Sequence, residues 1–253
     1  MNIIFLGAPG SGKGTQASLL SSNLNIESIS TGDLLRKEVE KKSKIGILAK
    51  SQMESGALVS DDVVIDIIKE KITTKSCEKG FILDGFPRNI NQAIKLEEML
   101  ENCNKKIDKV FNFEVEEDVL IKRIAGRYTC KKCNAVYNRY FKPTLKDGEC
   151  DNCGSSELEN RIDDNEETVK NRLKVYKESS FPLIEYYKKK YLLVSIDALK
   201  ISTLVFEELK SKSMPDLSKL PKSTSSSNSN LREASPFISF LSTFRLVTSI
   251  LLI

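Results

Sequence analysis

The stretch FLGAPGSGKGTQ, residues 5–16, decides the expected fold. It follows the short apolar run NIIFLG (2–7) and precedes a segment that can form a helix, so a strand, a glycine-rich loop and a helix are expected in that order. Gly7, Gly12 and Lys13 match the phosphate-binding pattern G-x-x-x-x-G-K-[ST]. In such a loop, backbone N–H groups surround a phosphate, and the lysine adds a positive charge. The stretch therefore predicts a nucleotide-phosphate site.

One position of the loop departs from the pattern. The residue after the lysine is normally Ser or Thr, whose hydroxyl holds Mg²⁺, but it is Gly14 here. The first hydroxyl comes one residue later, at Thr15. The loop is thus either a degenerate match or a variant that handles its metal differently.

Strand and helix patterns alternate along the rest of the chain. Buried strands are expected within 80–89, ending at Asp84, and at 109–115 and 192–196; helices are expected at 14–24, 30–43, 58–72, 116–127, 163–181, 182–190 and 201–211. Ser30 or Thr31 and Ser60 are the expected caps of the second and third helices. This alternation predicts an α/β fold, with a mostly parallel sheet flanked by helices and ligands at the carboxyl ends of the strands.

Composition narrows the chemistry. The 253 residues are 40% hydrophobic and 29% charged, which suits one sizeable α/β domain with inserts. A net charge of +4 is too mild to favour nucleic-acid binding and is compatible with an anionic small substrate. The chain has no histidine, which excludes a Ser-His-Asp triad, an imidazole base and a histidine metal site.

Four cysteines have the spacing of a metal site. Cys130, Cys133, Cys150 and Cys153 form a C-x₂-C-x₁₆-C-x₂-C set, which offers four thiolates to a tetrahedral ion. The start MNIIFLG does not resemble a signal peptide, so metal ligands are favoured over disulfides. Four ligands leave no open position, which indicates a structural ion. Zinc is favoured, and mononuclear iron stays open.

The character of the chain changes after about residue 212. The segment 213–253 begins with a Ser-, Pro- and Lys-rich linker that is expected to be disordered. It ends in the apolar residues 237–253, interrupted by Arg245 and shorter than the roughly 20 residues of a spanning helix. A membrane anchor, a partner-binding segment and an extension without a role are all compatible with it.

Several motifs together resemble a known family. In order come GAPGSGKGT (7–15), STGDLLR (30–36), GALV (56–59), LDGFPRNINQA (83–93), RIAGR (123–127) and RIDDNEETVKNRL (161–173). Over residues 1 to about 210 the chain resembles adenylate kinases and related nucleoside monophosphate kinases. The resemblance accounts for Gly14, since Mg²⁺ in this family is held mainly by nucleotide phosphates and waters. It implies a core of 1–29, 60–126 and 165–212, a monophosphate-binding insert of 30–59 and a lid of 127–164 that carries the cysteines and structural Zn²⁺.

The resemblance also implies the activity and its residues. It implies transfer of the terminal phosphoryl group of ATP to AMP, giving two ADP, with Mg²⁺. Implied catalytic residues are Lys13, Arg88, Arg123, Arg161 and Arg172. Implied ATP-binding residues are Gly10, Ser11, Gly12, Lys13, Gly14, Thr15, Arg127, Val136, Tyr137 and Lys200. Implied AMP-binding residues are Thr31, Arg36, Ala57, Leu58, Val59, Gly85, Phe86, Pro87, Arg88, Gln92, Arg161 and Arg172.

Three further parts of the sequence bear on the expected site: Asp84, the pair Asp163 and Asp164, and Lys200. Asp84 ends a buried strand, where a carboxylate can hold the waters around Mg²⁺ or serve as a cap. Asp163 and Asp164 are expected to cap the following helix and to hydrogen-bond the lid arginines. Lys200 matches the family weakly, because Ala198 and Leu199 before it depart from the usual sequence.

Other functions remain open at this stage. A related enzyme would use GTP as donor or another monophosphate as acceptor. A zinc ribbon that binds nucleic acid is disfavoured, because acidic residues balance the basic ones in residues 128–160. A membrane-tethered interaction protein would rest on the tail alone. We expect a cytoplasmic monomer that binds ATP, AMP and ADP, binds no nucleic acid and makes no essential membrane contact.

Overall fold

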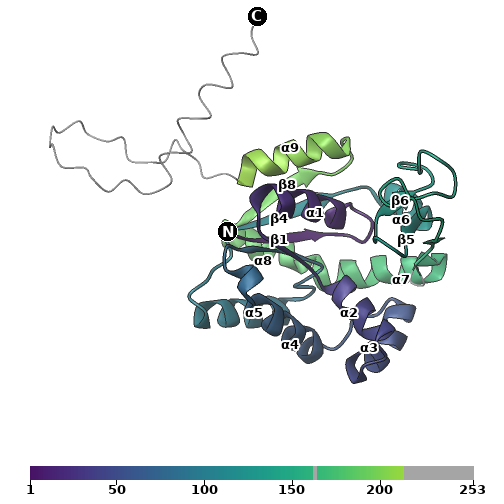
Figure 1. Cartoon of the computed structure of the whole chain (residues 1–253). Coiled ribbons are helices and arrows are strands. Elements are labelled where there is room, and N and C mark those ends of the chain that lie inside the picture. Colours follow the sequence, from purple (N-terminus) through teal and green to yellow (C-terminus); the bar gives the residue numbers. More distant parts are fainter. Residues whose placement is uncertain (162–163, 214–253) are drawn as a thin grey trace, which may run out of the picture. The chain divides into compact units, whose positions relative to one another are not determined.

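A five-stranded parallel sheet forms the centre of the protein. The computed structural model describes residues 1–161 and 164–213. The sheet has the order β2-β3-β1-β4-β8, and every neighbouring pair is parallel (Figure 1). The strands are β1 (Asn2–Gly7), β2 (Glu27–Ser30), β3 (Phe81–Asp84), β4 (Lys109–Glu114) and β8 (Leu193–Asp197). The predicted α/β fold with a parallel sheet is confirmed.

Helices cover both faces of this sheet. On one face, α1 (Lys13–Leu24) and α9 (Ser202–Ser213) pack on side chains such as Phe5 and Phe111 (Figure 1). On the other, the apolar sides of α2 (Thr31–Glu40), α4 (Asp61–Ile72), α5 (Ile90–Asn102) and α8 (Pro182–Lys189) bury residues such as Leu83. Because both faces of the sheet are covered, the central strands β1 and β3 are nearly continuous apolar runs, NIIFLG and FILD, instead of alternating.

A third cluster joins two helices near the glycine-rich loop. Leu120 and Ile124 of α6 (Glu117–Ala125) pack on Val169 and Leu173 of α7 (Glu166–Val175), together with Ala8 of the loop. The π-helical turn Tyr176–Ser180 and then α8 continue from α7. The chain between α6 and α7 is the cysteine segment.

The cysteine segment has a small sheet of its own. Its antiparallel strands are β5 (Arg127–Cys130), β6 (Val136–Asn138) and β7 (Leu158–Glu159), in the order β6-β5-β7. Residues 44–55 form a further helix, α3 (Lys44–Ser55), which packs against α2 and α7. A short 3₁₀ turn covers Lys75–Cys77.

Element boundaries differ from the expectation where local capping decides them. Ser30 caps α2 by accepting from Asp33 N at 3.3 Å, but this helix ends at Glu40 instead of residue 43. Asn165, not Asp164, caps α7: its side chain accepts from Thr168 N at 2.9 Å. The expectation that Asp164 caps this helix is therefore wrong. Asp163 and the tail from residue 214 lie outside the described residues.

The sequence patterns did not predict α3, α5, β2 or the strands of the cysteine segment. We found no helix in the described ranges, 1–161 and 164–213, that is long and apolar enough to cross a membrane.

Candidate active site

The glycine-rich loop joins β1 to α1 and folds around the Lys13 ammonium. Gly12 precedes α1 with a φ of 93°, a left-handed conformation that glycine adopts without strain. Lys13 Nζ donates to the carbonyl oxygens of Gly7 at 2.7 Å and Ala8 at 2.9 Å, and to Ser11 Oγ at 3.2 Å. The loop therefore holds a cation beside a helix N-terminus, where backbone dipoles already favour an anion.

The carboxylate of Asp84 lies next to this loop. Asp84 ends β3 and pairs with Phe5 of β1, and its side chain faces Gly14. Burial raises the pKa of Asp84, opposed by the positive charge of Lys13. Burial likewise lowers the pKa of Lys13 to about 8, opposed by the charge of Asp84. The site thus holds one carboxylate and one ammonium, each partly stabilised by the other. The other predicted loop residues, Gly10 and Thr15, lie in the loop and in the first turn of α1.

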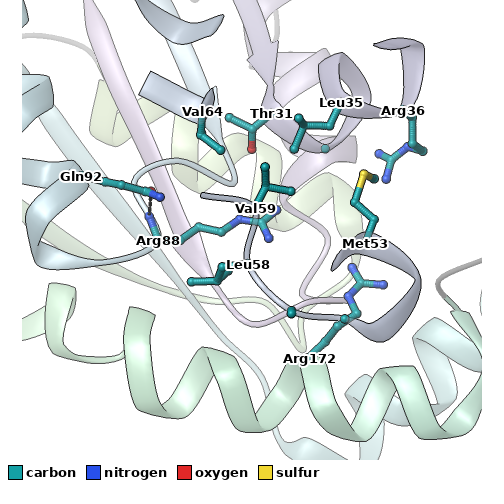
Figure 2. A pocket seen from close by; sticks show the side chains of 13 residues that line it. Thr31, Leu35, Arg36, Met53, Leu58, Val59, Val64, Arg88, Gln92 and Arg172 are labelled. Atoms are coloured by element: carbon teal, nitrogen blue, oxygen red, sulfur yellow. Dashed lines mark hydrogen bonds between the residues drawn. The ribbon is translucent and has the colours of Figure 1, made fainter. Parts of the chain in front are cut away.

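A pocket opens beside the loop, between α2, α3, α4 and α7. Figure 2 shows that its arginines approach from different elements: Arg36 from α2, Arg88 from the β3–α5 connection and Arg172 from α7. The residues that line the pocket are Thr31, Gly32, Leu35, Arg36, Met53, Gly56, Ala57, Leu58, Val59, Val64, Arg88, Gln92 and Arg172. Apolar side chains therefore form one part of the wall and guanidinium groups another, which suits a ligand with a flat base and a phosphate.

Most of the predicted monophosphate-binding residues line this pocket. Gly85, Phe86, Pro87 and Arg161 do not: Phe86 is fully buried, while the Gly85 carbonyl accepts from Thr31 Oγ1 and from Arg88 Nε, both at 2.8 Å. Gly85 thus holds two of the lining side chains in place. The prediction missed Gly32, Leu35, Met53, Gly56 and Val64, although GALV (56–59) and STGDLLR (30–36) mark the segments that contain three of them.

Further arginines gather around Asp164. The side chain of Asp164 is only 3% exposed, and it accepts from Arg127 at 2.7 and 2.5 Å and from Arg172 at 3.2 Å. The predicted contact of Asp164 with lid arginines is confirmed. Burial, with Arg127 and Arg36 nearby, lowers the pKa of Arg161 to about 10. Several guanidinium groups close together provide a positive potential that attracts a polyanion.

Arg123 lies apart from that group. Its guanidinium donates to the Ala198 carbonyl at 2.9 Å and lies 5.7 Å from the centre of the Phe141 ring. Lys200 follows in the same β8–α9 connection, but its ammonium pairs with Glu208 of α9 at 2.9 Å. Lys200 therefore follows two residues after the carbonyl that Arg123 contacts, while its side chain pairs with α9.

Val136 and Tyr137 lie on β6 of the cysteine segment. The Tyr137 side chain is 3% exposed; it stacks on Tyr128, and its hydroxyl lies 3.3 Å from Cys150 Sγ. A side chain in this position belongs to the interior of the segment. Only the backbone of residue 137 is left for contact with a nucleotide base.

The four predicted cysteines converge. Their Sγ atoms all lie within 4.8 Å of one another, with Cys130–Cys153 at 3.6 Å and Cys133–Cys150 at 3.5 Å. Sulfurs bound tetrahedrally at 2.3 Å from zinc would be about 3.8 Å apart. The donor set and its spacing therefore fit a metal ion. Among the described residues all six cysteines are free thiols.

These features together define a class of protein. A phosphate-binding loop at the carboxyl edge of a parallel sheet, next to a pocket with arginines for a second anionic ligand, is the arrangement of a P-loop kinase that acts on a nucleotide. Comparison with known proteins identifies the family within this class.

A family model described as adenylate kinase matches residues 5–192. The adenylate kinase of Archaeoglobus fulgidus is 51% identical over 209 residues, which cover 83% of this chain and 96% of the relative. Those of Hydrogenobaculum sp. and Methanosarcina barkeri are each 51% identical over 211 and 210 residues, covering 83% of this chain and 99% and 97% of the relatives. The chain belongs to the adenylate kinase family, and it is a phosphotransferase.

Proposed function

We propose that this enzyme transfers the terminal phosphoryl group of ATP reversibly to AMP, giving two ADP. One observation carries the proposal: the arginine pocket and the phosphate loop meet at Lys13. Arg88 and Arg172 line the pocket, and both are near enough to Lys13 to lower the pKa of its ammonium. A monophosphate in the pocket and a triphosphate on the loop would therefore present their phosphates to the same cluster of cations.

The donor site is the loop with its helix. Backbone N–H groups of residues 10–15 would surround the ATP phosphates, and Lys13 would exchange its carbonyl partners for phosphate oxygens. Arg127, with the backbone of residues 136, 137 and 200, would contact the rest of the donor nucleotide. Mg²⁺ would bind mainly to phosphates and waters, with the Asp84 carboxylate holding some of those waters.

The acceptor site is the pocket. Arg36 and Arg88 would hold the AMP phosphate, since a guanidinium can make two parallel hydrogen bonds to it. The base would lie against the apolar wall near Val59 and Val64, with the Gln92 amide at its edge. Arg161 and Arg172 complete the group of cations.

The chemistry needs no general base. Phosphoryl transfer depends on in-line positioning and on stabilisation of negative charge on the transferred group. Lys13, Arg88, Arg123, Arg161 and Arg172 would supply positive charge for that stabilisation. We propose that the insert 30–59 and the lid 127–164 close over the two nucleotides and exclude water, because free water would otherwise accept the phosphoryl group.

The cysteine site would hold a structural Zn²⁺. Four thiolates suit zinc and leave no position for substrate, so the ion would stabilise the lid without entering the reaction. Tetrahedral iron has the same geometry, and metal analysis separates the two. Free thiols at this site suit a reducing compartment such as the cytoplasm. Because one chain supplies both nucleotide sites, a monomer suffices.

The deciding experiment measures ADP formation by the full chain with Mg-ATP against AMP, GMP, CMP and UMP in turn, and then with GTP as donor. We expect two ADP for each AMP consumed and far slower turnover of the other acceptors. Lys13→Met, which removes the loop cation, is the negative control and should lose most activity while it keeps the fold. Equal rates with another monophosphate would overturn the assignment of AMP, and retained activity of Lys13→Met would overturn the role of the loop.

A further inference from the structure

Asp61 lies outside the pocket but contacts a residue that lines it. It is the first residue of α4, and its Oδ1 accepts from Gln92 Nε2 at 2.7 Å and from Asn89 Nδ2 at 2.9 Å. Its Oδ2 accepts from Asn91 Nδ2 at 2.8 Å. Neither the family motifs nor the predicted site includes Asp61.

The Gln92 amide is held at both of its ends. Nε2 donates to the Asp61 carboxylate, and Oε1 accepts from the Arg88 backbone N–H at 2.7 Å, drawn as the dashed line in Figure 2. The backbone N–H can only donate, and an ionised carboxylate can only accept. A flipped amide would place donor against donor and acceptor against acceptor. The network therefore permits one orientation of this amide.

Asp61 is suited to this task by its own environment. Burial opposes its ionisation, but the Asn91, Asn89 and Gln92 amides together hold the pKa of Asp61 below its usual value. Its carboxylate is thus an acceptor throughout the neutral pH range. Asn89 also accepts from Gln92 N at 2.8 Å and fixes the backbone from which the amide projects.

An amide held in one orientation can hydrogen-bond a purine edge that has a donor and an acceptor in one order, but not an edge that has them in the opposite order. After these contacts, Gln92 has one N–H and one oxygen lone pair left for a ligand. The edge of adenine carries an amino donor at position 6 and an acceptor at N1, whereas hypoxanthine and guanine carry O6 and N1–H, the opposite order. The orientation held by Asp61 and Arg88 presents acceptor and donor in a single spatial order, and reversing that order needs the flip.

We propose that Asp61 is a specificity-determining positioning residue, which selects 6-aminopurine over 6-oxopurine monophosphates by preventing the Gln92 amide from flipping. The inference rests on the proposed function, because it requires AMP in the pocket with its base at Gln92. It deepens that function because it attributes the selectivity for AMP to Asp61, a residue that does not contact the substrate.

The test compares AMP with inosine monophosphate, which reverses the edge but lacks the extra amino group of guanine. The measured quantity is the ratio of kcat/KM for AMP to that for inosine monophosphate, with Mg-ATP as donor. Dissociation constants from calorimetry give the same ratio if turnover of one acceptor is too slow. In Asp61→Asn, which offers a donor to a flipped amide, the ratio should fall about tenfold.

Asp62→Asn is the matched control. Asp62 is the next residue of α4 and also links this helix to α5, through Lys95 at 3.2 Å, but it does not contact Gln92. Its ratio should stay at the wild-type value. A general loosening of the α4–α5 contact would move both variants alike and would overturn the proposal.

The double variant separates action through Gln92 from any other route. In a Gln92→Ala background, Asp61→Asn should not change the ratio further, because no amide remains to be held. An undiminished effect there, or an unchanged ratio in the single variant, would overturn the positioning role. If Asp61→Asn does not fold, Asp61→Ser can replace it, because Ser also lacks the acceptor-only carboxylate and suits the first turn of a helix. The same changes in the ratio would then support or overturn the proposal. A wild-type enzyme without preference for AMP would instead refute the assignment of AMP, and the inference with it.

Discussion

The Asp84 carboxylate and Gly14 are in close contact: a Cβ added to residue 14 would lie 3.3 Å from Asp84 Oδ2. The unusual glycine of the loop therefore faces the carboxylate that ends β3. In the common loop, a Ser or Thr at this position brings a hydroxyl toward the metal. Here the Asp84 carboxylate occupies that side, and Gly14 leaves room for it because glycine has no side chain.

We expect Gly14→Ser to impair the enzyme without unfolding it. The new side chain would press on the Asp84 carboxylate and displace the waters that we propose it holds around Mg²⁺. We predict that kcat/KM for Mg-ATP falls about tenfold and that more Mg²⁺ is needed for half-maximal rate. Asp84→Asn should raise the Mg²⁺ requirement in the same way. An Mg²⁺ dependence identical to wild type in both variants would refute a role of Asp84 near the metal.

The pKa of Lys13 predicts an alkaline limit of the reaction. Since burial lowers this pKa to about 8, the free enzyme loses the loop charge above that pH, and kcat/KM for Mg-ATP should decline there. The folded pKa lies below the ordinary 10.5, so this group makes the free energy of unfolding rise between pH 8 and 10.5. Titration of Lys13 therefore does not unfold the protein in this range. Lys13→Arg keeps its charge, and its slower reaction should lack the decline; if the decline persists in that variant, another group causes it.

Substitution of Asp164 is expected to lower the stability of the protein. Asp164 is nearly inaccessible and binds both Arg127 and Arg172, so Asp164→Asn removes a buried negative charge that these two partly buried cations share. We expect the free energy of unfolding to fall by about 2 kcal/mol, measured by urea unfolding. Asp62→Asn, which breaks an exposed ion pair, should cost less than about 1 kcal/mol. Equal losses in the two variants would mean that the Asp164 cluster contributes no special stability.

The cysteine site predicts a metal that stabilises the lid. Cys130→Ser should lose bound zinc, measured by elemental analysis, and lower the melting temperature more than it lowers kcat at low temperature. Cys103→Ser is the control, since Cys103 is exposed and lies outside the cluster. If the wild-type protein is purified with iron, the ion is iron and not zinc. If Cys130→Ser leaves the melting temperature unchanged, the ion has no structural role.

The central fold and the donor loop could be predicted because their signals are local. Apolar runs ending in Gly7 and Asp84 gave β1 and β3, and the loop pattern placed Lys13 at a helix start. The cysteine spacing placed four sulfurs together. These patterns describe neighbours in the chain, and the structure confirms the elements and the convergence that they predict.

Features that depend on contacts between distant segments could not be predicted in this way. α3 packs so closely on α2 that a Cβ on Gly46 would lie 2.0 Å from the Glu38 carbonyl oxygen, and a lone glycine does not reveal such a contact. Met53 enters the pocket only because α3 folds back there. Asp61 resembled any acidic residue in the first turn of a helix until its three amide partners on the α5 side were seen.

Because α6 packs against α7, the two ends of the proposed lid are held by residues outside it. The proposed lid, 127–164, follows α6 and precedes α7, and the contact of these helices through Ile124 and Val169 includes Ala8 of the phosphate loop. Both ends of the lid are therefore anchored by residues that it does not contain. A lid of another length, held by polar side chains in place of a metal, could be joined to the same two helices. The phosphate loop and the α6–α7 contact beside it would not change. The requirement for zinc would then belong to the lid alone, so descendants of this chain could lose it without rebuilding the enzyme.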